Sequence, residues 1–192
     1  MRRRAAMAGT AAVVIVLMVA VFIAKRGLPA FGGGPAAHGA VAPAPAVPAP
    51  PGRKIKARLF YVAGDGARLT SVERDVAYGE GPDGQAREIV AAQIAPVVEP
   101  LVSAIPPGTT LRAVFITKAG DAYVDLSREA RTSHPGGTLN ELLTVYTIVN
   151  VLTVNLPAVT GVQVLVDGKE VDTLSGHVDL RRPLAKNLAW IQ

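Results

Sequence analysis

The sequence predicts a small single α+β domain in which pairs of strands alternate with helices in the order ββ-α-ββ-α-ββ, preceded by a transmembrane helix. Apolar residues at helical spacing fill residues 138–153, which predicts a long buried helix. Short runs rich in β-branched and aromatic residues, separated by turn residues, predict the strands. Because the strands come in hairpin pairs, we expect a largely antiparallel or mixed sheet with both helices packed on one face.

The N-terminal region begins with a basic start, residues 1–4, followed by residues 5–24, which contain no charged side chain. Twenty helical residues span about 30 Å, the thickness of the hydrocarbon core of a bilayer. Lys25 and Arg26 follow without a small-residue cleavage site, which favours an uncleaved signal anchor over a cleaved signal peptide. The arginines before the run place the N-terminus in the cytoplasm. We therefore expect a single-pass protein of the cytoplasmic (inner) membrane with an extracytoplasmic, or periplasmic, domain.

Residues 25–54 form a linker rich in Pro, Ala and Gly, which contains the run VAPAPAVPAPP at 41–51. Alternating Ala and Pro favours an extended polyproline II conformation. This composition predicts a spacer that holds the domain away from the membrane. The domain itself is expected at residues 55–186, with a C-terminal tail at 187–192.

The first half of the domain is expected to contain a hairpin and a helix. Alternating apolar residues predict strands at 55–61 and 69–76, on either side of turn residues. A helix fits the apolar residues that follow Gln85, and Pro96 indicates that it ends near Ala95.

The second half begins with strands at 111–117 and 122–126, followed by a polar connection. The long helix starts after Gly136 and Gly137, and Thr138 with Glu141 has the spacing of a capping box. Because this helix is apolar on most of its circumference, it must be covered on most sides.

The last part of the chain is expected to form a strand at 162–166 and a return strand at 169–174. Asp167 and Gly168 between them are the strongest hairpin signal in the sequence. A last short strand is expected at 178–180.

The net charge of +5 does not indicate a nucleic-acid partner, because it belongs to the N-terminal region. Residues 1–54 hold seven of the 20 lysines and arginines and none of the 15 acids, so the remaining residues carry a net charge of −2. A domain that neutralises phosphates would carry the positive charge itself. The absence of cysteine excludes disulfides, thiolate metal sites and cysteine nucleophiles.

Ser175, His177 and Asp179 contain the side chains of a hydrolytic triad at a spacing of two. On a strand this spacing puts neighbouring side chains in parallel about 6–7 Å apart, which does not suit a hydroxyl–imidazole–carboxylate relay. His134 and His177 could share a metal with Asp125 or Asp179, but their separation is not that of a metal site. We therefore predict no catalytic residue, no metal and no cofactor.

Two features of the long helix have alternative interpretations. Gly136 and Gly137 at its start could expose backbone amides to an anion, although a capping box would occupy those donors. Tyr146 and Asn150 share one helix face, where we expect a core tyrosine and an amide bonded to a loop carbonyl.

Several segments resemble the GerMN domain of spore-germination GerM-type proteins. The similarity covers roughly residues 57–184 and is carried by an ordered set of motifs, PGGT at 135–138 with Glu141, VYTIVN at 145–150, VQVLVDGK at 162–169 and TLSGHVDL at 173–180. Segments AIPPGT at 104–109 and VDLS at 124–127 also fit. The chain departs from the family pattern in three ways: it shows one copy rather than two, its predicted anchor is a helix rather than a lipid, and Val151 stands where Thr is expected.

The resemblance implies a non-catalytic module that mediates protein contacts or envelope assembly outside the membrane. The implied partners are envelope proteins or a second copy of the chain, with peptidoglycan binding and, less favoured, hydrolysis as alternatives. The positions that carry the family pattern are taken as structural residues: Gly136, Gly137, Thr138, Glu141, Tyr146, Asn150, Asp167, Gly168, His177 and Asp179.

Overall fold

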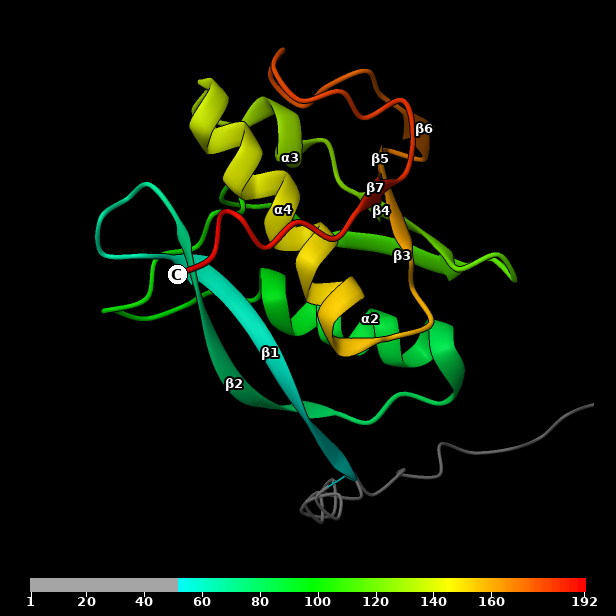
Figure 1. Cartoon of the computed structure of the whole chain (residues 1–192). Helices are drawn as coiled ribbons and strands as arrows, with labels where there is room; N and C mark the ends of the chain where they lie inside the picture. Colours follow the sequence, from blue (N-terminus) through cyan, green and yellow to red (C-terminus); the bar gives the residue numbers. More distant parts are fainter. Residues whose placement is uncertain (1–51) are drawn as a thin grey trace, which may run out of the picture. The chain divides into compact units, whose positions relative to one another are not determined.

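The computed structural model describes residues 52–192, in which two sheets lie on opposite sides of a pair of helices (Figure 1). The smaller sheet pairs β1 (Lys54–Val62) with β2 (Leu69–Ala77) in antiparallel register. The helices between the sheets are α2 (Gly81–Ile94) and α4 (Thr138–Asn155), and α3 (Glu129–Thr132) is a single turn. The larger sheet is formed by β3 (Leu111–Ile116), β4 (Asp121–Leu126), β5 (Gly161–Val166) and β6 (Lys169–Glu170), with β7 (Leu184–Ala185) paired to β5.

The predicted α+β class is confirmed, and the larger sheet is mixed. β3 pairs with β4 in antiparallel orientation, whereas β4 pairs with β5 in parallel, and α4 forms the connection between these two parallel strands. The expectation of one sheet was wrong, because the β1–β2 hairpin forms a separate sheet. Periodicity identifies a strand and its inward face, but it does not say which sheet a hairpin joins.

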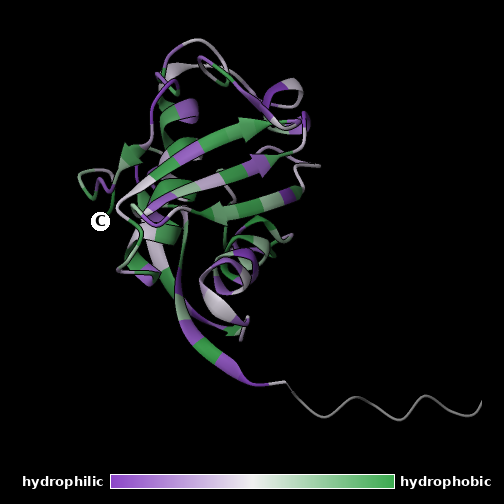
Figure 2. Ribbon diagram, turned by 90° about the vertical axis from the view of Figure 1, so that its right-hand side faces the viewer, coloured by the Kyte–Doolittle hydropathy of each residue, from purple (hydrophilic) through white to green (hydrophobic). Residues whose placement is uncertain are grey.

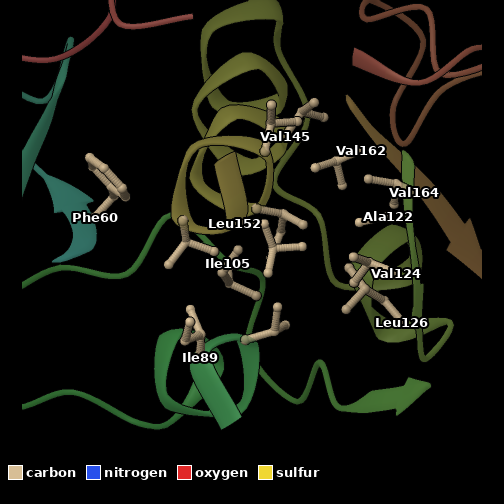
Figure 3. Close-up of a cluster of buried hydrophobic side chains, with 14 of the residues drawn as sticks. Phe60, Ile89, Ile105, Ala122, Val124, Leu126, Val145, Leu152, Val162 and Val164 are labelled. Carbon is tan, nitrogen blue, oxygen red and sulfur yellow. The ribbon is translucent and has the colours of Figure 1, made fainter. Parts of the chain in front are cut away.

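The position of α4 between two sheets explains its composition. Its side chains meet β1 of the smaller sheet on one side and β5 of the larger sheet on the other. Figure 3 shows Leu152 between Phe60 of the smaller sheet and Val124 of the larger one. The prediction that this helix is covered on most sides is therefore confirmed.

Several predicted boundaries differ from the structure. Helix α2 begins one turn earlier than Gln85, because Pro82 fits the first turn of a helix. The return strand after the Asp167–Gly168 turn covers only 169–170, and residues 178–180 are not a strand. The strand that pairs there with β5 is β7, which comes later in the chain.

The predicted capping box of α4 was also wrong. Gly137 occupies the cap position without a side-chain hydrogen bond, so Thr138 does not cap the helix. The carboxylate of Glu141 turns instead toward a distant loop.

The described residues contain no helix that is long and apolar enough to cross a membrane. The predicted basic start at 1–4, the transmembrane helix at 5–24 and residues 25–51 of the linker lie outside the described residues. Figure 2 shows the larger sheet from the side opposite the helices, where no helix from residues 52–192 covers its face.

Candidate functional site

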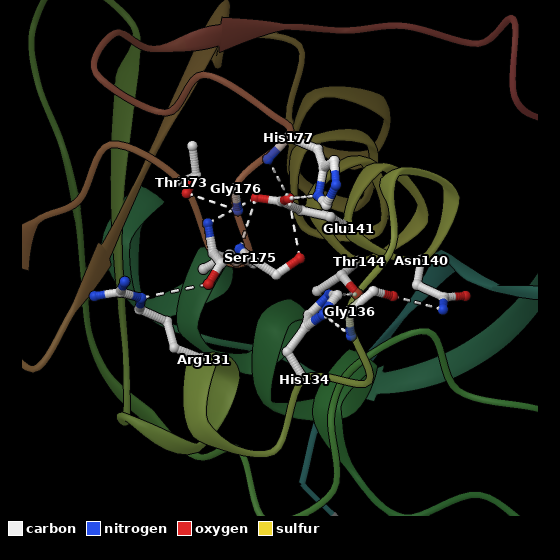
Figure 4. Close-up of polar contacts among 11 residues, drawn as sticks. Arg131, His134, Gly136, Asn140, Glu141, Thr144, Thr173, Ser175, Gly176 and His177 are labelled. Carbon is white, nitrogen blue, oxygen red and sulfur yellow. Dashed lines mark hydrogen bonds and ion pairs between the residues drawn. The ribbon is translucent and has the colours of Figure 1, made fainter.

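The main polar cluster of the domain is built around the buried carboxylate of Glu141 in the first turn of α4 (Figure 4). Glu141 has 0% of its surface exposed. Its Oε1 accepts the backbone N–H of Leu174 at 2.7 Å and of Ser175 at 3.0 Å. Its Oε2 accepts the backbone N–H of His177 at 2.7 Å and the hydroxyl of Ser175 at 3.1 Å. We refer to Glu141, Leu174, Ser175 and His177 as the Glu141 cluster.

The cluster stabilises the charged form of its carboxylate. Burial by itself raises the pKa of Glu141, but the backbone N–H groups of Ser175, His177 and Leu174 and the Ser175 hydroxyl outweigh it. The net result is a pKa below the ordinary value of a glutamate. The His177 ring adds Nδ1 at 3.2 Å from Oε2 on the solvent side of the cluster. A buried negative charge thus holds the loop after β6 against the start of α4.

The suspected triad does not form. Ser175 Oγ and His177 Nδ1 both meet Oε2 of Glu141, so the carboxylate lies between hydroxyl and imidazole. A nucleophilic relay needs the imidazole in the middle, where it can take the proton of the hydroxyl. Asp179 is not part of the cluster, because its carboxylate pairs with Arg181 at 2.7 Å. The arrangement is suited to fixing a loop rather than to activating a nucleophile.

His134 lies near the same end of α4 and is held as a neutral ring. Its Nδ1 accepts the backbone N–H of Gly136 at 3.0 Å. The hydroxyl of Thr144 donates to the carbonyl of Ala104 at 2.6 Å, so Nε2 of His134 must donate its proton to that hydroxyl, 3.3 Å away. Burial, the largest influence, lowers the pKa of His134. Within residues 52–192 no three His, Asp or Glu side chains are grouped as metal ligands would be.

The two glycines before α4 act as a turn. Gly136 and Gly137 have φ values of 79° and 84°, which side chains with a Cβ rarely adopt. The side chain of Asn140 donates to the carbonyl of Gly136 at 2.8 Å and closes this turn. Neither Thr138 nor Glu141 thus accepts a backbone N–H as a cap, and the turn before the helix is fixed by its glycines and by the Asn140 bond instead.

The other predicted family positions stabilise loops. Asn150 donates to the carbonyl of Asn187 at 2.8 Å, which is the bond to a loop carbonyl expected of it, while Tyr146 is only partly buried. Asp167 and Gly168 form the β5–β6 turn with φ values of 51° and 75°. The N–H of Gly168 donates to Asp125 at 2.7 Å, which ties this turn to β4.

The sequence interpretation missed two amide side chains that close the free edge of β1. Asn155 accepts the N–H of Arg58 and donates to its carbonyl, both at 2.8 Å. Gln93 accepts the N–H of Phe60 at 2.8 Å and donates to its carbonyl at 2.7 Å. The available signal was a glutamine four residues after Ile89, on the apolar face of the predicted helix.

Comparison with known proteins gives one family and a set of similar folds. The family model Germane, described as sporulation and spore germination, matches residues 58–172. A search of curated proteins found no match.

Three solved structures cover 69% of the chain. The tandem GerMN domains of the sporulation protein GerM from Bacillus subtilis are 17% identical with a TM-score of 0.54, and the match spans 46% of that chain. The first GerMN domain of the same protein is 18% identical, with a TM-score of 0.48 over 96% of that chain. A candidate lipoprotein from Clostridium perfringens is 24% identical, with a TM-score of 0.49 over 88% of that chain. The tandem-domain match shows a shared fold.

Proposed function

The chain belongs to the Germane family of sporulation and spore germination, and from this membership we propose that it is a non-catalytic interaction or assembly module of the cell envelope. In this proposal the apolar run at residues 5–24 anchors the protein in the cytoplasmic membrane with its N-terminus inside. The linker at 25–54 then holds the domain outside the membrane as a spacer.

The observation that carries the proposal is the helix-free face of the larger sheet. Val114 of β3 and Val124 of β4 point into the core, so their neighbours Phe115 and Tyr123 stand on the opposite face. Phe115 and Tyr123 are paired across the two strands, and Phe115 is 57% exposed. An exposed Phe115 beside a partly exposed Tyr123, on a sheet face that no described helix covers, is a surface suited to contact with a partner.

The non-catalytic part of the proposal is supported by the Glu141 cluster. The Ser175 hydroxyl and the His177 imidazole both bond to the Glu141 carboxylate, so the imidazole does not lie between hydroxyl and carboxylate as a hydrolytic relay requires.

A photo-crosslinking amino acid placed at position 115 in intact cells tests this proposal. We expect it to yield a discrete crosslinked envelope protein or a crosslinked dimer, because Phe115 is an exposed aromatic side chain on the face that no described helix covers. The matched control is the same amino acid at Arg87, an exposed position on α2. Equal and diffuse labelling from both positions would contradict the proposal.

Peptidoglycan binding is a second candidate, because aromatic side chains such as Phe115 and Tyr123 can stack on sugar rings. It predicts co-sedimentation with purified peptidoglycan that is lost on Phe115→Ala, together with no protein crosslink from position 115. That pair of results would replace the assembly function with a wall-binding function.

A further inference from the structure

The two edges of the smaller sheet differ in how their backbone groups are satisfied. From this difference we infer that the outer edge of β2 binds an extended segment of a partner protein, rich in basic side chains, as an added β-strand. This inference rests on the proposed function as an interaction module and names the form that one contact takes.

The edge of β1 is closed. Arg58 and Phe60 turn their N–H and C=O groups away from β2, and the amides of Asn155 and Gln93 occupy all four groups. The next outward residue, Val62, donates to the carbonyl of Val102 at 2.8 Å. No added strand has access to this part of the β1 edge.

Among the described residues, the edge of β2 is occupied only at its two ends. The N–H of Leu69 donates to the carbonyl of Trp190 at 2.7 Å, and the carbonyl of Leu69 accepts the N–H of Gln192 at 3.0 Å. At the other end the carbonyl of Ala77 accepts the side chain of Gln85 at 3.2 Å.

Alternate residues of a strand present their backbone groups to the same edge, so Ser71, Glu73 and Asp75 face outward like Leu69 and Ala77. The register agrees, because Ser71 lies opposite Phe60, whose backbone groups also point outward. Within residues 52–192, the backbone groups of these three residues bond to no other residue. We refer to Ser71, Glu73 and Asp75 as the open β2 edge.

The open β2 edge continues from a place where an extended segment is already paired. Ile191 of the C-terminal tail forms a parallel bridge with Leu69. The geometry of the edge therefore accepts a strand, and a partner segment would continue that pairing along the three open residues. Such a segment spans about 13 Å of strand and is recognised mainly through its backbone.

The side chains of the open edge indicate the charge of the partner. Glu73 and Asp75 share one face of β2, and both are exposed. An added strand would lie about 4.8 Å from them and about twice as far from Lys56 and Arg58 on β1. The carboxylate of Asp75 already pairs with Lys56 at 2.7 Å, whereas Glu73 forms no ion pair within residues 52–192. Lysine or arginine in the added strand would therefore pair first with Glu73 and compete with Lys56 for Asp75, and opposite charges stabilise cross-strand pairs.

The same charges disfavour a second copy as the occupant. Antiparallel self-pairing centred on Glu73, the register that uses all three open residues, would place two glutamates directly opposite each other. Like charges in opposite positions destabilise a strand pair.

The probes for the test are two fluorescein-labelled heptapeptides, one of alternating lysine and valine and one of alternating glutamate and valine. Fluorescence anisotropy with the purified 192-residue chain is expected to show about tenfold tighter binding of the basic peptide, from one or two cross-strand charge pairs. Hydrogen exchange at Ser71, Glu73 and Asp75 should slow when the basic peptide is bound. Equal affinity for both peptides, no binding of either, or exchange that slows elsewhere would overturn the inference.

Two variants separate backbone pairing from charge. Glu73→Pro removes one outward N–H without taking a bond from the β1–β2 ladder, so we expect a loss of binding of about tenfold or more with the fold retained. Glu73→Lys keeps that N–H, so it should still bind a peptide but weaken the preference for lysine. If Glu73→Pro binds as the unchanged chain does, or if sedimentation shows a dimer that Glu73→Pro dissolves, the inference fails. Crosslinking from position 115 is independent of these peptides, so failure of the peptide assays alone leaves the proposed function standing, and the two failures can be told apart.

Discussion

Replacing Glu141 with alanine is expected to lower the free energy of unfolding by about 3–5 kcal/mol. Three backbone N–H groups and one hydroxyl donate to this carboxylate, and the side chain is buried completely. Removal of the acceptor leaves buried donors such as the N–H of Leu174 unpaired, and each unpaired donor costs about 1–3 kcal/mol before relaxation. Chemical denaturation followed by circular dichroism measures the loss.

The matched control is Glu170→Ala, which removes an exposed glutamate from β6 and should change stability by about 0.5 kcal/mol or less. Glu141→Gln provides a variant of nearly equal size, in case the alanine variant does not fold. The single side-chain carbonyl oxygen of the glutamine can accept some of these hydrogen bonds. We therefore expect its loss of unfolding free energy to lie between those of Glu141→Ala and Glu170→Ala. A loss of under about 1 kcal/mol in Glu141→Ala would show that the cluster does not hold the loop.

The Glu141 carboxylate is also expected to make stability depend on pH. Its pKa is lower in the folded protein than its ordinary value, so it contributes stability above the ordinary glutamate pKa, about 4.3. That contribution is lost as the pH falls below this value through the lower pKa of the folded state. The difference in unfolding free energy between the unchanged chain and Glu141→Gln should therefore shrink from neutral pH to about pH 3. A constant or growing difference would contradict the assignment.

Local sequence pattern was enough to find most elements of the fold. The helical spacing of apolar residues predicted α4, and the Asp167–Gly168 pair predicted the β5–β6 turn. The resemblance to the GerMN domain is confirmed by the family match over residues 58–172. These signals act over a few residues or over an ordered series of motifs, and both are visible in a single sequence.

The candidate site depends on contacts that no local pattern contains. Glu141 has the spacing of a capping box, but its partners lie 33 to 36 residues later in the chain. The sequence interpretation rejected a triad because it placed Ser175, His177 and Asp179 on a strand. The structure also shows no relay, but for another reason. The backbone N–H groups of Leu174, Ser175 and His177 donate to the carboxylate of Glu141, which the sequence interpretation had assigned to a capping box.

The contacts that close the edge of β1 could not be predicted from local sequence pattern either. A substitution at this edge is the second prediction with a large expected effect on stability. Replacing Gln93 with leucine is expected to lower the free energy of unfolding by about 2–4 kcal/mol. Gln93 has 0% of its surface exposed, and its amide satisfies both backbone groups of Phe60 in the buried interior. Leucine fills a similar volume, so the loss measures the two hydrogen bonds rather than a cavity.

Asn155→Ala is the control for Gln93→Leu, because the partly buried Asn155 makes the same pair of bonds to Arg58 where solvent reaches them. Water can replace the amide there, so the expected loss is about 1 kcal/mol or less. The ratio of the two losses in unfolding free energy tests whether burial, rather than the number of hydrogen bonds, determines how much each amide stabilises the β1 edge. Equal losses in equilibrium denaturation would show that the interior around Phe60 admits water, and the two helices would then not seal the smaller sheet as the structure indicates.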